Sequence, residues 1–299
     1  AIGVNSLDAN TTADSNTAVG HNALSTVVTG TQNTAVGRGS LANATSGCNT
    51  AVGYNALVSL SSGHSNVAVG DLALDAATQG HYNVGIGESA LTTLTTGGEN
   101  VAVGREALRD STSGDSNTAV GRGSLAGATN GDLNTSIGAS SGENVSSGDK
   151  NVFVGFESGA QGGMINITSE DNRFVAGHST ITNAYVKVDW TVTSDERDKT
   201  NFGSIPHGLD FVNQLNPVSF QFRTARDEDT TNGGVRYGFK AQDILALEKA
   251  NGGSNVIIDD EFEDALKLTG GQLVPVLVKA IQELKAQNDS LKSRIETLE

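Results

Sequence analysis

The segment Asn66-Val67-Ala68-Val69-Gly70-Asp71-Leu72-Ala73-Leu74 is one copy of a motif that fills the first half of the chain. The shared core is Asn-Thr-Ala-Val-Gly-x-x-Ala-Leu, and its glycine returns every 17 residues, with one interval of 16 between Gly37 and Gly53. The ten glycines are Gly3, Gly20, Gly37, Gly53, Gly70, Gly87, Gly104, Gly121, Gly138 and Gly155. A short fixed period over so many copies is typical of a solenoid, in which each copy forms one coil.

Each copy is expected to form a short strand followed by a turn. Residues 67–69 are β-branched or small and end at a glycine, which favours a strand. Ala73 and Leu74 suit a tight turn or a single helical turn. The recurring asparagines, Asn33, Asn49, Asn66, Asn83, Asn100 and Asn117, either stack as a ladder of amides or bond the backbone of their own turn. We favour the bond within the turn.

The small interior of each coil predicts that chains associate side by side. A copy supplies roughly four apolar side chains, and burying a Val or Leu gains about 1.5–3 kcal/mol. Ordering each residue costs about 1.5 kcal/mol, so a single thin ribbon barely breaks even. We therefore expect an obligate oligomer, most naturally a homotrimer. Ten coils spaced about 4.8 Å apart would make a rod on the order of 50 Å long.

Composition excludes several classes of function. The chain carries 34 acidic and 19 basic residues, so it lacks the basic stripe that nucleic-acid binding requires. No apolar run approaches the 18 residues of a membrane span. The five histidines lack metal-ligand spacing, and neither a metal nor a cofactor is expected. The chain begins within a motif at Ala1, which predicts a preceding attachment region.

The repeat fades after Gly155, which divides the chain into four predicted parts. Residues 1–155 form the repeat rod, and 156–193 a β-rich joint and distal shaft with strand-like tracts at Phe174–Ala176 and Ala184–Val192. Residues 194–272 have the composition of a mixed α/β domain, and 273–299 that of a coiled coil. The predicted fold class is mainly β, a trimeric β-solenoid or β-roll rod followed by this α/β domain and helix.

Within the α/β domain, strands are expected at Val218–Phe222 and Tyr237–Phe239. Helical segments are expected around Leu209–Leu215 and over Asp243–Ala250. The final segment repeats apolar residues at the 3-4 spacing of a coiled coil, with Val274, Ile281, Asn288 and Ile295 at one heptad position and Leu277, Leu284, Leu291 and Leu298 at the other. A plain amphipathic surface helix is the alternative. In isolated peptides this pattern with a buried Asn288 favours two strands, but the rod argues for three.

One charged stretch stands out as a candidate site, Ser194-Asp195-Glu196-Arg197-Asp198-Lys199. It is followed by Leu215-Asn216-Pro217-Val218-Ser219-Phe220, by Tyr237-Gly238-Phe239-Lys240-Ala241-Gln242-Asp243-Ile244 and by Val276-Leu277-Val278-Lys279-Ala280-Ile281. This ordered set, over about 194–299, resembles the peptidase S74 family, the C-terminal intramolecular chaperone of phage tail spikes and fibres.

The resemblance implies a Ser–Lys dyad that cuts its own chain once. Ser194 would be the nucleophile, Lys199 the general base and Thr193–Ser194 the scissile bond. A lysine serves as base only when it is neutral, and Asp198 beside it, where the family often has an apolar residue, opposes that state. In an extended segment the two side chains would point to opposite faces, which reduces the effect. The alternative is that Ser194 and Lys199 are ordinary solvated loop residues. Any catalysis would be this single autoproteolysis, with no activity in trans.

Rod and resemblance together predict a tail fibre or appendage protein of a phage virion, assembled in the host cytoplasm and acting outside the cell. Its expected partners are two further copies, a host cell-surface receptor such as a glycan or another outer-surface component, and other virion tail proteins through the preceding region. The repeats also resemble the head repeats of trimeric autotransporter adhesins, which share an Ala-Val/Ile-Gly core. The alternative is therefore a bacterial trimeric surface adhesin with a structural, non-cleaving C-terminal cap.

Overall fold

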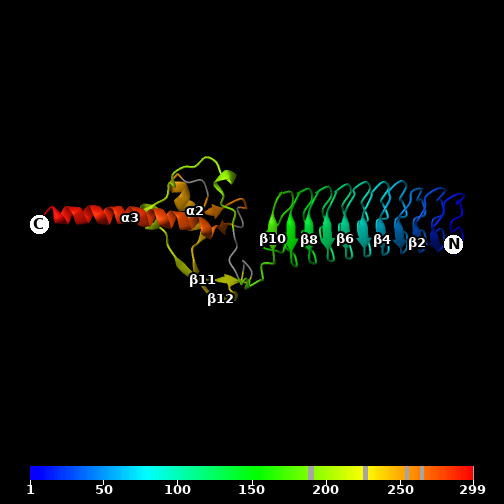
Figure 1. Cartoon of the computed structure of the whole chain (residues 1–299). Helices are drawn as coiled ribbons and strands as arrows, with labels where there is room; N and C mark the ends of the chain where they lie inside the picture. Colours follow the sequence, from blue (N-terminus) through cyan, green and yellow to red (C-terminus); the bar gives the residue numbers. More distant parts are fainter. Residues whose placement is uncertain (188–191, 225–227, 253–255, 263–265, 299) are drawn as a thin grey trace. The chain divides into compact units, whose positions relative to one another are not determined.

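The computed structural model describes the chain except residues 188–191, 225–227, 253–255, 263–265 and 299 (Figure 1). It divides into two compact units, Ala1–Ile181 and Thr182–Glu299. The first unit contains the repeats and the second the mixed α/β segment with the C-terminal helix. Each unit is described by itself.

The first unit is a β-solenoid, as the repeat predicts. Within residues 1–181, all of which the structure describes, ten short strands form one parallel sheet in sequence order (Figure 1). Equivalent motif positions pair from coil to coil, so that Ala102 lies opposite Ala119. The strands are β1 (Thr17–Val19), β2 (Thr34–Val36), β3 (Thr50–Val52), β4 (Val67–Val69), β5 (Val84–Ile86), β6 (Val101–Val103), β7 (Thr118–Val120), β8 (Thr135–Ile137), β9 (Val152–Val154) and β10 (Phe174–Ala176).

The segment after each strand is a tight turn, not a turn of helix. Gly104 directly follows β6 and has φ 136°. A Cβ placed there would lie 2.5 Å from the carbonyl oxygen of Gly121 in the next coil. Leu108, further along this turn, has φ 51°, a region that side chains rarely adopt. Its backbone N–H donates to Ser124 O of the next coil at 3.0 Å, and its side chain is fully buried. Burial and the inter-coil bond therefore offset the backbone strain.

A single chain fills the interior of its own coils. The middle residue of most strands is a buried alanine, and most turns bury a leucine. The buried strand positions include Ala18, Ala35, Ala51, Ala68, Ala102 and Ala119, and the buried turn positions include Leu24, Leu41, Leu57, Leu74, Leu91, Leu108 and Leu125. The motif thus buries several small and large side chains in each regular coil, as with Ala51, Ala56, Leu57 and Leu60.

The motif asparagines form a ladder, so the favoured prediction that each bonds its own turn is wrong. Asn83 Nδ2 donates to Asn66 Oδ1 at 3.2 Å, and Asn100 Nδ2 donates to Asn83 Oδ1 at 3.1 Å. Each amide also donates to a backbone carbonyl of the following coil, as Asn100 does to Gly114 O at 2.7 Å and Asn33 to Ser46 O at 3.0 Å. Asn49 alone among these examples adds a bond to its own turn, from Nδ2 to Gly47 O. The motif asparagines are fully buried, so no water can bond their amide groups. Each amide therefore takes its hydrogen-bond partners from the neighbouring coils.

A large aromatic side chain fills the solenoid interior near its C-terminal end. Phe153, in β9, occupies the position that alanine holds in most strands and is fully buried. Room for the ring comes from Gly142, where a Cβ would lie 2.9 Å from Phe153 Cδ2. The second predicted strand tract, at 184–192, is wrong for residues 184–187, which have no regular structure, and residues 188–191 lie outside the described residues. Tyr185 is exposed there. The segment is not a strand, because alternation stabilises a strand only when a neighbouring strand pairs with it.

The second unit is a small α/β structure, as predicted. Its elements are a 3₁₀ turn η1 (Glu196–Asp198), α1 (Leu209–Val212), β11 (Val218–Arg223), β12 (Thr231–Gly238), α2 (Ala241–Ala250), β13 (Ile258–Asp259), β14 (Lys267–Leu268), η2 (Gly270–Gln272) and α3 (Leu273–Glu296). β11 pairs antiparallel with β12, and β13 with β14. The predicted strand at 237–239 is the end of the longer β12, which stops at Gly238.

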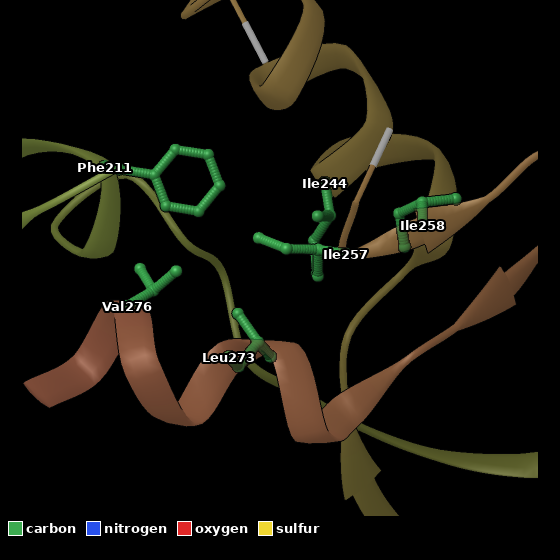
Figure 2. Packing of buried hydrophobic residues seen from close by; sticks show 6 residues of the cluster. All are labelled: Phe211, Ile244, Ile257, Ile258, Leu273 and Val276. Carbon is green, nitrogen blue, oxygen red and sulfur yellow. The ribbon is translucent and has the colours of Figure 1, made fainter. Parts of the chain in front are cut away.

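A compact core joins α1, α2, β13 and the start of α3. Figure 2 shows its six buried side chains converging from these elements and from the residue just before β13: Phe211, Ile244, Ile257, Ile258, Leu273 and Val276. Two polar anchors support it. The fully buried Glu248 of α2 accepts the backbone N–H groups of residues 256–258 at 3.0–3.1 Å. Glu283 of α3 accepts Leu209 N, at the start of α1, at 2.7 Å.

Beyond this core, α3 carries its apolar stripe on the surface. Leu284 is 52 % exposed and Leu291 54 % exposed, so the heptad positions beyond the core lack cover in the described part of one chain. None of the described helices is long and apolar enough to span a membrane.

Candidate functional site

The two residues of the predicted dyad are brought together across one turn. Lys199 Nζ lies 2.6 Å from Ser194 Oγ and donates to it. The same ammonium also donates to the backbone carbonyl oxygen of Ser194 at 3.2 Å. Thr193, on the other side of the predicted scissile bond, is exposed. The predicted nucleophile, the predicted base and the predicted scissile bond therefore lie within one short accessible segment.

The η1 turn between the two residues creates this proximity. Asp195 is its N-cap, and its side chain accepts Arg197 N at 2.9 Å. The backbone of Lys199 donates to Glu196 O at 3.1 Å and closes the turn. A 3₁₀ turn advances the chain by only about 2 Å per residue, so it shortens the path from 194 to 199 compared with an extended strand. The sequence-based expectation of an extended segment is wrong for 196–198, although the backbone of Lys199 itself is extended.

A bidentate ion pair holds the side-chain face of this turn. Arg197 Nη2 lies 2.6 Å from Asp195 Oδ2, and Arg197 Nε lies 3.0 Å from Asp195 Oδ1. The pKa of Asp195 is held below its usual value, first by the hydrogen bond from the Arg197 side chain and then by that from the Arg197 backbone. From the sequence, Asp195 and Arg197 stood out only as members of the charged stretch 194–199. The recognisable signal is an Asp at the cap position with an Arg two residues later.

The dyad is open to solvent in a single chain. Ser194, Asp198 and Lys199 are all exposed. Desolvation is the ordinary means by which a protein keeps a lysine neutral, and a lysine must be neutral to remove a proton. Within the described residues, Ser194 and Lys199 thus lie within hydrogen-bonding distance of each other, but no side chains bury them.

A surface hollow lies elsewhere in the second unit. Its volume is about 500 Å³, and α2, the turn after α1 and the residues before α2 line it. Lining residues include Leu215, Phe239, Lys240, Asp243 and Leu247. Neither Ser194 nor Lys199 contributes to it, so it is not part of the dyad. Among the described residues, no group of three or more His, Cys, Asp or Glu side chains is placed to hold a metal ion.

Comparison with known families gives one match. The family model described as chaperone of endosialidase, peptidase S74, matches residues 194–252. The match begins at Ser194 itself and covers the dyad, α1, β11, β12 and α2. No curated protein and no solved structure matches the chain. The peptidase S74 resemblance inferred from the sequence is confirmed over residues 194–252, and the solenoid of 17-residue repeats is confirmed by the fold.

Proposed function

We propose that this chain is a fibre protein of a virion, in which a trimeric β-solenoid rod is assembled by the C-terminal unit and then freed from it by one self-cleavage. The observation that carries the proposal is the family match that starts at Ser194, where Lys199 Nζ lies 2.6 Å from Ser194 Oγ. A chaperone fused to the end of a repetitive rod fits a fibre, because identical coils along the rod could pack side by side out of register unless the chains are first aligned.

The outer face of the solenoid sheet supports association of three chains. The third residue of each strand from β1 to β9 is a valine or isoleucine that points outward, and it remains partly exposed in one chain. Its exposure is 36 % at Val69, 37 % at Val120 and 49 % at Ile137. These residues follow one another coil by coil in parallel register, so they form a continuous β-branched row along the rod. A long exposed apolar row is typical of a surface that a partner covers.

The C-terminal helix supports the same association independently. The heptad residues of α3 are exposed over several turns, and Asn288 would set their register in a bundle. Identical helices from three copies would cover each other's stripes and hold three rods in register. The helix would thus align the chains before the outer rows meet.

The proposed cleavage uses only the residues around Ser194. Ser194 Oγ attacks the carbonyl carbon of Thr193 while Lys199 Nζ takes the hydroxyl proton. That proton passes to the Ser194 nitrogen as the peptide C–N bond breaks, which leaves an ester between Thr193 and Ser194 Oγ and a free α-amino group on Ser194. Water then hydrolyses the ester, giving a Thr193 carboxylate and the restored Ser194 hydroxyl. The exposed dyad would become active once neighbouring copies cover it.

Host attachment is the biological role that we propose for the released rod. The positions after the motif glycine vary from coil to coil and face the solvent. Tyr54 is 45 % exposed with the Arg38 guanidinium 5.5 Å from its ring centre, and Arg105 forms an ion pair with Glu88 at 3.5 Å. Varied side chains on a regular scaffold suit recognition of a host surface component, such as a glycan. The protein would then be located in the virion and act outside the host cell.

The mass of the purified chain tests the cleavage. The parent is expected to split into pieces of 1–193 and 194–299, whereas Ser194→Ala and Lys199→Ala stay intact. Full-length mass for all three proteins would refute self-cleavage and favour the alternative, a surface adhesin with a permanent cap.

Light scattering after size exclusion tests the assembly. We expect three chains per particle for the Ser194→Ala protein. Replacing outward Val69, Val120 and Ile137 together by Ser is expected to weaken lateral packing of the rods, seen as faster proteolysis of the rod. A monomeric parent in dilute solution would refute the trimer.

A further inference from the structure

The most specific side-chain arrangement beside the dyad is the Asp195–Arg197 pair. Both carboxylate oxygens of Asp195 are engaged, Oδ1 by Arg197 N and Nε and Oδ2 by Arg197 Nη2, over distances of 2.6–3.0 Å. The pair spans the first half of η1, and the dyad residues lie immediately outside the turn. The pair therefore lies within the turn and places both of its charges next to the dyad.

The charged groups nearest in sequence to the lysine belong to the same turn. Four charged side chains lie between Ser194 and Lys199 or at the turn itself: Asp195, Glu196, Arg197 and Asp198. Among the described residues, no hydrogen bond or ion pair from another element to Lys199 was found. With Asp195 saturated by Arg197, the ammonium of Lys199 instead reaches Ser194 Oγ. Without Arg197, the free Asp195 carboxylate would compete for Lys199 and favour its protonated form.

We propose that Asp195 and Arg197 are positioning residues of the self-cleavage site: their pair shapes the turn that sets Lys199 Nζ on Ser194 Oγ and keeps the Asp195 carboxylate away from the lysine. This inference rests on the proposed self-cleavage, to which it adds two residues that touch neither the scissile bond nor the reacting oxygen.

The first test measures the rate of cleavage of the full chain by intact mass. Asp195→Asn and Arg197→Gln are expected to slow cleavage by about ten- to a hundredfold, because displacement by an ångström costs on that order. Arg197→Lys keeps the cation and should recover most of the rate. Glu196→Gln is the matched control, since it removes one carboxylate from the same turn without touching the pair. Equal rates for Asp195→Asn and Glu196→Gln would overturn the proposal.

The second test does not depend on cleavage. In the Ser194→Ala background, pulsed acetylation at a series of pH values followed by peptide mass spectrometry reports the reactivity of Lys199, with the exposed Lys292 as internal reference. Arg197→Gln is expected to move the labelling midpoint of Lys199 to higher pH by about half a unit or more, a threefold or larger change in the neutral fraction. Glu196→Gln should not move it upward.

The two tests separate the possible failures. If the parent does not cleave but Arg197→Gln still moves the labelling midpoint, self-cleavage is refuted and the charge role of the pair stands. If the parent cleaves while Arg197→Gln cleaves at the parent rate with an unchanged midpoint, the role of the pair is refuted and self-cleavage stands.

Discussion

Loss of one amide from the middle of the asparagine ladder should destabilise the whole rod. Asn100 is fully buried and donates to Asn83 Oδ1 at 3.1 Å and to Gly114 O at 2.7 Å. Its own Oδ1 accepts the backbone N–H of Asn117 at 2.9 Å. Asn100→Ala would therefore remove contacts to the coils on both sides.

The magnitude follows from the groups that remain unpaired. The side chain is the partner found for both Gly114 O and Asn117 N, whereas Asn83 Oδ1 still accepts the Asn100 backbone N–H at 3.0 Å. Each orphaned buried group costs about 1–3 kcal/mol, so the two together cost about 2–6 kcal/mol. Asn100→Asp should cost more, because a carboxylate would face two oxygen acceptors without a proton to donate.

The assay is guanidinium unfolding followed by far-UV circular dichroism at one fixed protomer concentration, since assembly makes the midpoint depend on concentration. Asn130→Ala is the matched control, because Asn130 is exposed and lies outside the ladder. Asn100→Ala should unfold at a clearly lower denaturant concentration than both the parent and this control. Coincident curves for Asn100→Ala and Asn130→Ala would refute the ladder as a source of stability.

Four further changes test other parts of the molecule. Gly104→Ala should prevent stable coil stacking, because its Cβ would lie 2.5 Å from a carbonyl oxygen of the next coil. The control Gly203→Ala, whose Cβ would meet nothing within 4 Å, should melt like the parent. Equal melting temperatures for the two variants would contradict this role of Gly104. Glu248→Ala should cost about 2–6 kcal/mol, because it leaves the buried backbone N–H groups of Ile257 and Ile258 unpaired at about 1–3 kcal/mol each; thermal unfolding measures the loss, and an unchanged melting temperature would be against it. Asn288→Leu should raise the melting temperature of the helix assembly and loosen its chain number in light scattering, and no change in either would mean that α3 is unpaired. Because the folded pKa of Asp195 is lowered, its contribution to the stability of the turn is present above the ordinary aspartate range and is lost as pH falls through the lowered pKa. Hydrogen exchange of residues 195–199 should therefore lose protection only at a pH below the ordinary aspartate range. Loss of protection already near pH 4 would contradict this stabilisation.

The sequence alone was sufficient for the repeat, the strands of the solenoid and the mixed α/β nature of the second unit. Period and glycine spacing predicted the parallel coils, because each copy must place equivalent residues at equivalent positions. The ordered motifs from Ser194 onward predicted the family that matches residues 194–252. The heptad spacing predicted the long helix α3, although its pairing with other copies stays a prediction.

Three features depended on contacts that a linear pattern does not carry. The asparagines bond across coils because burial removes water from both neighbours, a consequence of stacking that is invisible in one copy. The alternation at 184–187 did not become a strand, because a strand needs a partner, and sequence alternation does not say whether one is present. The interior proved better filled than one copy suggests, since leucines in left-handed turns point back over the alanines.

The same division applies to the candidate site. The sequence predicted which residues would take part in cleavage, because Ser194 and Lys199 are recognisable by type, order and family pattern. Only the tertiary structure decided how they meet: a 3₁₀ turn, capped by Asp195 and clamped by Arg197, carries the lysine back to the serine oxygen. The physical reason is that a motif lists chemical groups along a line, whereas a hydrogen bond of 2.6 Å depends on how the backbone between them folds.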